Sequence, residues 1–288
     1  MRWTPGGRSP NLEDRRGQGG GFTRMGTGLG IGGGLVVLIL SLLFGGDIFT
    51  GGSDQTGTGT RTATSGGELA PADSAREEPM VQFVSFVLDN VQDTWKKILP
   101  QIGTRYRDAH LVLFRDLTQS GCGTAQATAG PFYCPTDEKV YIDLGFYDEL
   151  RRRLGAPGDF AQAYVIAHEL GHHVQHLLGT EQRVRALQER NPDAVNELSV
   201  RLELQADCYA GVWAHATSEQ RILEQGDIEE GLNAAAAVGD DRLQRMTTGR
   251  VNAETFTHGT SDQRMRWFRR GLSNGDPREC DTFNATSV

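Results

Sequence analysis

The spacing of apolar residues separates the chain into a regular C-terminal part and an irregular beginning. In residues 79–99, valines recur at the three- and four-residue spacing of an amphipathic helix. Short apolar runs at 109–116 ("AHLVLFRD") and 139–147 ("KVYIDLGFY") predict strands. From Phe160 to the mid-240s, and again in "SDQRMRWFRRGL" near the end, the pattern is helical. A few strands followed by many helices predict an α+β fold that is predominantly helical, with a small sheet.

The N-terminal region shows a different pattern. Residues 1–24 carry five arginines, and residues 25–46 contain no charge and centre on "LVVLILSLLF". A run of about 20 apolar residues can span a bilayer as a helix, and the preceding arginines favour a cytoplasmic N-terminus. We therefore expect one transmembrane helix at 25–46, after a cytoplasmic tail at 1–24. A cleaved signal peptide is the alternative, because the ten-residue apolar centre also fits an h-region.

The next segment differs again in composition. Residues 47–78 are rich in Gly, Thr and Ser and predict a flexible linker. The folded domain is then expected at 79–288, on the periplasmic side of the inner membrane. The formal net charge of −8 argues against a nucleic-acid partner, which would require a basic face.

The four cysteines are consistent with an exported domain. Cys122 and Cys134 bracket a short Gly/Ala/Thr loop, so a local disulfide is the simple pairing. Cys208 and Cys280 would then form a second disulfide that ties a helix to the C-terminal tail. Four free thiols or a metal site are the alternatives, but neither the spacing nor a nearby histidine suggests a cysteine-rich zinc site.

The stretch "AHELGHHVQHLLG", residues 167–179, contains His-Glu-x-x-His within a largely apolar helical pattern. Successive helix residues are rotated by about 100°, so His168 and His172 lie one turn apart and can reach one ion. Zinc accepts imidazole nitrogens, and Glu169 can take a proton from a zinc-activated water. A histidine-rich surface helix is the alternative, which the apolar residues around Glu169 disfavour.

Two protein ligands hold a catalytic zinc poorly, so a third is expected, with the fourth position left to water. The predicted helix at 201–215 carries Glu203 and Asp207 four residues apart on one face. One carboxylate can bind the metal while the other accepts the far N–H of a ligand histidine, and the residues alone leave the order open. A solvated acid pair is the alternative. His173 and His176 lie off the ligand face, where structural or surface contacts are expected.

These motifs carry a resemblance to known peptidases. His-Glu-Leu-Gly-His followed by Glu-Leu-Gln-Ala-Asp is similar to the gluzincins, and especially to their membrane-associated members. More of the chain resembles the bacterial neutral zinc metallopeptidase family, on "NLEDRR", "GPFYCP", "VYIDL", "HELGHHVQ", "ELQADCYAG" and "THGT". The resemblance implies a zincin-like domain with one catalytic zinc ion and a peptide or protein substrate. It further implies that Glu203 is the third zinc ligand and that Asp207 orients His168.

The resemblance also suggests roles for a strand and a loop. Gluzincins pair extended substrates with an edge strand, which would be "KVYIDL" here, although an ordinary core strand is the alternative. His258 stands before a glycine and a predicted helix start, where it can stabilise the oxyanion formed by water attack on a carbonyl. Tyr209 and Arg264 have suitable chemistry as well and remain alternatives.

Together, these patterns predict a membrane-anchored zinc metallopeptidase, a hydrolase that cleaves peptide bonds with Glu169 as general base. The alternative is a membrane-tethered binding or assembly factor that keeps the zinc fold with little turnover. An intact Glu169 favours the enzyme, because a scaffold would need the metal ligands but not the base.

Overall fold

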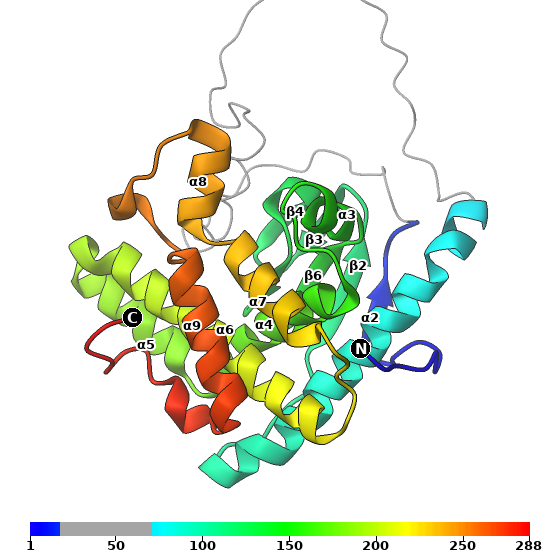
Figure 1. Ribbon diagram of the computed structural model, residues 1–288, viewed down its shortest axis with the longest axis horizontal. Helices are drawn as coiled ribbons and strands as arrows, with labels where there is room; N and C mark the ends of the chain where they lie inside the picture. The colour runs from blue at the N-terminus through cyan, green and yellow to red at the C-terminus, as the bar shows by residue number, and fades with distance from the viewer. Residues whose placement is uncertain (18–70) are drawn as a thin grey trace, which may run out of the picture.

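The computed structural model describes residues 1–17 and 71–288, and it has the predominantly helical α+β architecture that the sequence predicts (Figure 1). Strands of the main sheet contact helix α4 (Asp159–Leu177). Helices α6 (Val195–Glu219) and α7 (Asp227–Ala237) also pack on α4. The other helices of the described part are α2 (Pro71–Ile98), α3 (Gly145–Arg152), α5 (Thr180–Arg190), α8 (Asp240–Thr248) and α9 (Ser261–Asn274).

The main sheet has four short strands in the order β1-β2-β6-β5. Their bounds are β1 (Leu12–Asp14), β2 (His110–Phe114), β6 (Lys139–Asp143) and β5 (Phe132–Cys134). β2 pairs in parallel with both β1 and β6, and β5 pairs antiparallel with β6. The apolar runs of β2 and β6 are buried on both faces, as expected for central strands. A separate hairpin joins β3 (Leu117–Ser120) to β4 (Gly123–Gln126).

Two expectations about the strand "KVYIDL" are corrected by the sheet. The edge-strand prediction is wrong, because β6 lies between β2 and β5, and β5 is the outermost strand at that end. The strand also stops at Asp143 instead of residue 147. The Asp143 carboxylate accepts a hydrogen bond from the Gly145 backbone N–H at 2.6 Å, and helix α3 begins there. A side-chain acceptor of this kind competes with strand pairing.

Residues 1–17 belong to the folded body, whereas a separate tail was predicted for residues 1–24. Strand β1 pairs with β2, and the Trp3 ring packs edge-on against Phe83 of α2 at 5.3 Å between ring centroids. Arg16 is buried and forms ion pairs with Asp14 and, at 2.7 Å, with Glu77 of α2. The body is therefore built from two stretches of chain that are distant in sequence.

Helix α2 starts at Pro71, so the predicted linker at 47–78 ends earlier than expected. The rest of that linker and the predicted transmembrane helix at 25–46 lie outside the described residues. Within 1–17 and 71–288, no helix has both the length and the apolarity needed to cross a membrane.

Glycines set the distances between the helices that carry the predicted site residues. A Cβ at Gly171 of α4 would lie 3.0 Å from the Ala206 carbonyl oxygen of α6, so only a small residue allows this approach. On the other side of α6, a Cβ at Gly271 of α9 would overlap the Cys208 carbonyl oxygen. The three helices thus pack with their backbones almost in contact, which brings side chains from distant parts of the sequence together.

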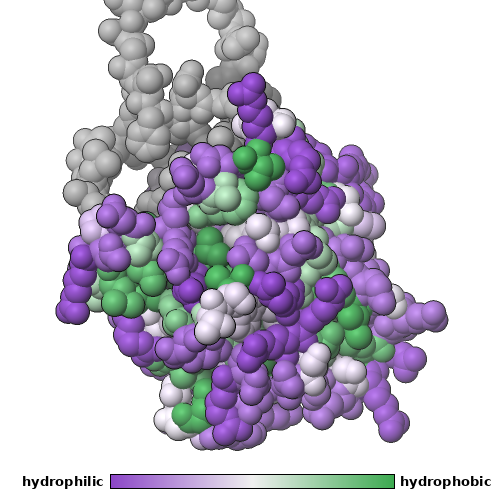
Figure 2. All heavy atoms as spheres, turned by 60° about the vertical axis from the view of Figure 1, so that its left-hand side comes forward, coloured by the Kyte–Doolittle hydropathy of each residue, from purple (hydrophilic) through white to green (hydrophobic). Residues whose placement is uncertain are grey.

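The visible face of the molecule is largely hydrophilic, with apolar residues in separate patches (Figure 2). Within the described residues, the large apolar side chains that are exposed are Leu117, Leu187, Met246 and Val251. The first two lie on β3 and α5, and the others lie on or just after α8. Buried histidine, carboxylate and arginine side chains lie inside the protein, between α4, α6 and α9.

Candidate metal centre

Helix α4 presents the two histidines of the His-Glu-x-x-His motif to one space. It is buried along most of its length, and His168 and Glu169 are 6 % and 8 % exposed. The rings of His168 and His172 are 4.9 Å apart between centroids and nearly perpendicular. One helical turn between them therefore produces the shared face that the sequence predicts.

Glu203 of α6 meets both histidines. Its carboxylate oxygens lie 3.2 Å from His168 Nε2 and 3.4 Å from His172 Nε2. One ligand atom from each of the three residues falls within 4.8 Å of the other two. Two imidazole nitrogens and a carboxylate oxygen in this arrangement fit the donors that zinc takes in proteins.

The charge state of Glu203 suits a metal ligand. Burial acts to raise the pKa of its carboxyl, but attraction from His172 and His258 and hydrogen bonds from both site histidines hold the pKa well below its usual range. The carboxylate is therefore ionised in the folded protein. An ionised and largely buried carboxylate requires a positive partner.

Asp207 lies one helical turn from Glu203 and has a different position in the site. Its side chain is fully buried and lies 2.8 Å from His168 Nδ1, on the opposite side of the ring from Glu203. Burial raises the pKa of Asp207, but Arg264 and His168 outweigh this effect and lower it below its ordinary value. Glu203 thus meets the Nε2 atoms of two histidines, whereas Asp207 meets the far nitrogen of one.

Sequence reasoning missed two partners of Asp207. Arg264 of α9 donates to it from Nε at 2.8 Å and from Nη2 at 2.9 Å, and the Tyr164 hydroxyl donates to it as well. Arg264 had been considered only as an alternative donor to an oxyanion, but its guanidinium is buried against the carboxylate. Tyr164 precedes His168 by one turn of α4, and that spacing was the one signal that could have indicated it.

Glu169 lies within the helical turn of α4 that runs from His168 to His172. Burial raises the pKa of its carboxyl above the ordinary value, and nearby Glu203 acts in the same direction. His168 and His172 oppose this shift without cancelling it. The carboxyl therefore exchanges a proton closer to neutral pH than an exposed glutamate does.

His258 is held beside the helical turn of α6 that carries Glu203. The loop that bears it lies against α6, because a Cβ on the next residue, Gly259, would be 3.2 Å from Val200 and 3.4 Å from Leu204. Asp240 fixes the loop by accepting hydrogen bonds from three consecutive backbone N–H groups, including that of His258 at 2.6 Å.

The other residues considered from the sequence lie elsewhere. Tyr209 packs edge-on against Trp95 of α2. His173 is fully buried between the Tyr133 hydroxyl at 2.9 Å and the Arg107 carbonyl at 2.7 Å, and burial lowers its pKa to about 4. His176 is near the carboxylates of Glu138 and Glu181. None of these belongs to the three-ligand cluster.

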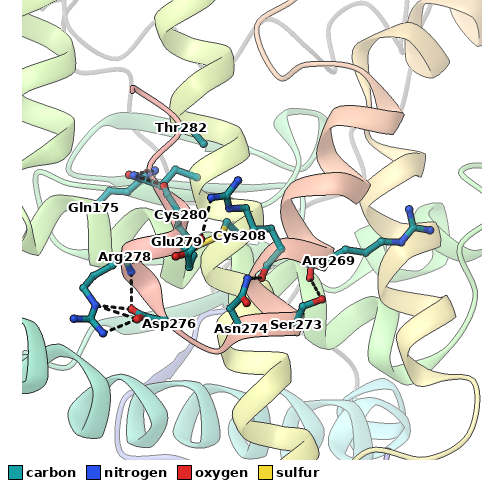
Figure 3. Close-up of a disulfide and its surroundings, with 12 residues drawn as sticks. Gln175, Cys208, Arg269, Ser273, Asn274, Asp276, Arg278, Glu279, Cys280 and Thr282 are labelled. Atoms are coloured by element: carbon teal, nitrogen blue, oxygen red, sulfur yellow. Dashed lines mark hydrogen bonds and ion pairs between the residues drawn. A yellow bond between two sulfur atoms is a disulfide. The ribbon is translucent and has the colours of Figure 1, made fainter. Parts of the chain in front are cut away.

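Both predicted disulfides are present. Cys122–Cys134 joins the turn after β3 to strand β5, and Cys208–Cys280 joins α6 to the C-terminal segment (Figure 3). Cys208 follows Asp207 directly, so the second disulfide is adjacent to the metal centre in sequence.

Comparisons with other proteins identify relatives of the chain and its family. Uncharacterized protein YpfJ of Escherichia coli (strain K12) is 50% identical over 287 residues, which cover 98% of this chain and 99% of that protein. Uncharacterized proteins Mb2605 of Mycobacterium bovis and Rv2575 of Mycobacterium tuberculosis are each 44% identical over 211 residues, which cover 69% of this chain and 69% of each relative. No solved structure matches the chain. The model of a family described as "Putative neutral zinc metallopeptidase" matches residues 1–283, from the N-terminal segment through the C-terminal disulfide, and the chain belongs to that family.

Proposed function

We propose that the protein is a zinc-dependent peptidase that hydrolyses peptide bonds, with one zinc ion held by His168, His172 and Glu203. The observation that carries this proposal is the convergence of their donor atoms within 4.8 Å, beside the buried Glu169. Catalytic zinc sites use three such ligands and leave a fourth position open. When bound, zinc supplies a positive charge that polarises a carbonyl group and makes water more acidic.

Glu169 is the general base in this proposal. It accepts a proton from the water that attacks the peptide carbonyl carbon, and it later passes a proton to the nitrogen of the departing amine. Its raised pKa supports both steps, because a group that titrates nearer neutral pH can accept and release a proton readily.

Asp207 orients His168. It accepts the Nδ1–H of that ring, so in the neutral form that binds a metal Nε2 carries no hydrogen, and Nε2 is the atom that faces Glu203. Arg264 and Tyr164 fix the Asp207 carboxylate in turn. Partners of this kind set the tautomer and direction of a ligand histidine.

His258 donates a hydrogen bond to the negative charge that develops on the attacked carbonyl oxygen. Its loop lies against α6 next to Glu203, and the other two candidates, Arg264 and Tyr209, are engaged with Asp207 and Trp95. Removal of such a donor lowers kcat by about 100- to 1000-fold. His258→Ala should therefore lose activity to that extent while its zinc content stays at the wild-type level, and unchanged kcat would exclude this role.

Extended substrates pair with the outer edge of strand β5. β5 is the outermost strand next to α4, and its Tyr133 hydroxyl bonds to His173, the neighbour of His172. Addition of a strand uses backbone hydrogen bonds and depends little on sequence. Broad specificity for unfolded peptide segments is the expected consequence.

Attachment to the membrane through residues 25–46 also remains part of the proposal, but with both ends of that segment on the same side of the membrane. Strand β1 pairs with β2, so residues 1–17 and 71–288 lie on the same side of any membrane while the fold is intact. The predicted cytoplasmic N-terminus and extracytoplasmic body would put the paired strands β1 and β2 on opposite sides, so we propose one side for both. Two disulfides favour the oxidising side for both stretches.

Labelling of single cysteines in intact cells tests this topology. Thr4→Cys and Met246→Cys place a thiol at an exposed position in each stretch. A membrane-impermeant maleimide should label both variants. Labelling of Met246→Cys alone would return the N-terminal segment to the cytoplasm and show that β1 does not pair with β2 in the cell.

The peptidase activity itself is tested with the purified chain. Zinc content is measured together with hydrolysis of casein, with and without a chelator. The wild type should bind one zinc ion and cleave casein, and the chelator should stop cleavage. Glu169→Gln is the matched control, since it should keep the zinc and lose the activity. A wild type that binds zinc but hydrolyses no more than Glu169→Gln would refute the proposal.

A further inference from the structure

Two buried glutamines have no part in the chemistry described so far. Gln175 lies in "HELGHHVQ" on α4, and Gln205 lies in "ELQAD" on α6, between Glu203 and Asp207. They are 1 % and 6 % exposed. A buried amide needs partners for both its oxygen and its nitrogen, and these partners lead from the metal centre to the C-terminal segment.

The hydrogen bonds form a continuous path. His172 Nδ1 is 2.9 Å from Gln175 Oε1. The Gln175 amide nitrogen donates to the Leu202 carbonyl at 2.7 Å and to Gln205 Oε1 at 3.2 Å. The Gln205 amide nitrogen donates to the Cys280 carbonyl at 2.9 Å. We call the path from His172 through Gln175 and Gln205 to Cys280 the amide relay.

The direction of the relay determines the tautomer of His172. Backbone carbonyls only accept hydrogen bonds, so the amide nitrogens must face Leu202 and Cys280, and the Gln175 oxygen must face the ring. An oxygen at that position accepts only from a protonated Nδ1. In the neutral ring, Nε2 of His172 then carries no hydrogen, and it is this atom that lies 3.4 Å from Glu203.

The far end of the relay is firmly anchored. Cys280 is bonded to Cys208 of α6, and the C-terminal segment is also held by Arg201, which donates to the Thr282 carbonyl. The Thr282 hydroxyl donates back to the Arg201 carbonyl at 2.7 Å. Figure 3 shows Gln175, Cys280 and Thr282 among the residues around the disulfide.

We propose that Gln175 and Gln205 are positioning residues that present Nε2 of His172 to a bound metal ion, and that the Cys208–Cys280 disulfide anchors them. The inference rests on the proposed metal centre. Each ligand histidine then has its own support on the far nitrogen, an ionised network of Asp207 and Arg264 for His168 and a neutral amide relay for His172. Loss of groups that support ligands in this way typically weakens metal binding by about 10- to 100-fold.

The first test measures the zinc dissociation constant by competition with a chelator in the full chain. Gln175→Met is nearly isosteric and removes the acceptor, so its zinc affinity should fall by about 10- to 100-fold. Gln205→Met and the double variant Cys208→Ala/Cys280→Ala should both lie between the wild type and Gln175→Met. Gln188→Met is the matched control, because its amide nitrogen bonds, among the described residues, to Val195 and Ser199 and not to the metal centre, and its affinity should be unchanged.

The second measurement needs neither metal nor a variant. Nitrogen chemical shifts of labelled histidines in the metal-free wild type, at alkaline pH, report which ring nitrogen of His172 carries the hydrogen. The relay requires Nδ1–H. An Nε2–H tautomer, or wild-type zinc affinity in a folded Gln175→Met, would overturn the proposal. Wild-type affinity in Gln205→Met with loss in Gln175→Met would overturn the part beyond Gln175.

These readouts are separate from peptide hydrolysis. A protein that binds zinc and shows the predicted tautomer but cleaves no peptide would refute the proposed function and leave the relay intact. A protein with the peptidase activity but with the other tautomer would refute the relay alone.

Discussion

Replacement of Asp207 by alanine should weaken the protein and its metal site at once. The Asp207 side chain is fully buried and accepts hydrogen bonds from Arg264 at 2.8 and 2.9 Å, from His168 at 2.8 Å and from the Tyr164 hydroxyl. Alanine leaves the Arg264 guanidinium, which is 3 % exposed, without its counter-charge. It also leaves His168 Nδ1 without an acceptor.

The expected magnitude follows from the burial of this pair. Removal of one partner of a buried ion pair destabilises a protein by about 3–5 kcal/mol, out of a total stability of about 5–15 kcal/mol. For a body of this size, each kcal/mol lowers Tm by about 2–4 °C, so a decrease of about 10 °C is expected. Zinc affinity should fall by about 10- to 100-fold, because the ligand histidine loses its orienting group.

The two effects can be separated by a second substitution. Denaturant titration with intact disulfides gives the free energy of unfolding of Asp207→Ala, of Arg264→Met and of the double variant. The double variant should recover part of the lost stability, because it buries no unpaired charge, while its zinc affinity stays low. If Asp207→Ala unfolds within about 1 kcal/mol of the wild type, a typical point-mutant loss, and binds zinc equally well, the described role of Asp207 is wrong.

Three further outcomes are expected. Glu169→Gln should retain zinc and lose hydrolysis, and near wild-type turnover would remove Glu169 as the base. Glu203→Ala should purify largely free of zinc, as metal analysis will show. Full zinc occupancy in this variant would mean that Asp207, and not Glu203, is the third ligand. His173 has a pKa lowered to about 4 by burial, against about 6.5 when unfolded. The contribution of neutral His173 to the free energy of unfolding is complete above pH 6.5, and about 3 kcal/mol of it is lost as the pH falls to 4. Relative to a His173→Gln variant, the wild type should lose that much on acidification, and parallel unfolding curves would contradict this.

The central part of the site could be predicted from the sequence because its geometry is local. His168 and His172 share a face through one helical turn, and the same holds for Glu203 and Asp207. Helical spacing therefore sufficed to propose His168 and His172 as ligands, whereas the choice of Glu203 over Asp207 came from the resemblance to known peptidases. The α+β class was predictable for the same reason, since alternation and helical periodicity are local properties.

The missed features depend on pairings between distant residues. Arg264 follows Asp207 by 57 positions, and only the packing of α9 on α6 brings them together. Strand β1 has three residues and owes its existence to pairing with β2, about 100 residues away. The order of strands in a sheet is likewise not encoded in any one strand. For this reason "KVYIDL" was taken for an edge when its burial on both faces fits the interior.

The charges of the metal centre explain why it should bind a divalent cation and release protons when it does. Glu203 and Asp207 are ionised, and Arg264 supplies one compensating charge. In the metal-free protein, burial opposes protonation of His168, yet Asp207 and Glu203 raise its pKa to about 9, and Glu203 raises the pKa of His172.

In the metal-free protein, protons on these rings thus balance the charge of the buried carboxylates. Zinc must displace these protons, since only neutral imidazole binds it. At pH 7 the histidine charge is present before binding and absent after it. Zinc affinity should therefore rise with pH up to about 9, the pKa of His168. Calorimetry in buffers of different ionisation enthalpy should detect the release of about one to two protons per ion. Affinity that is independent of pH would mean that the histidines are already neutral, and that the buried carboxylates are balanced in some other way.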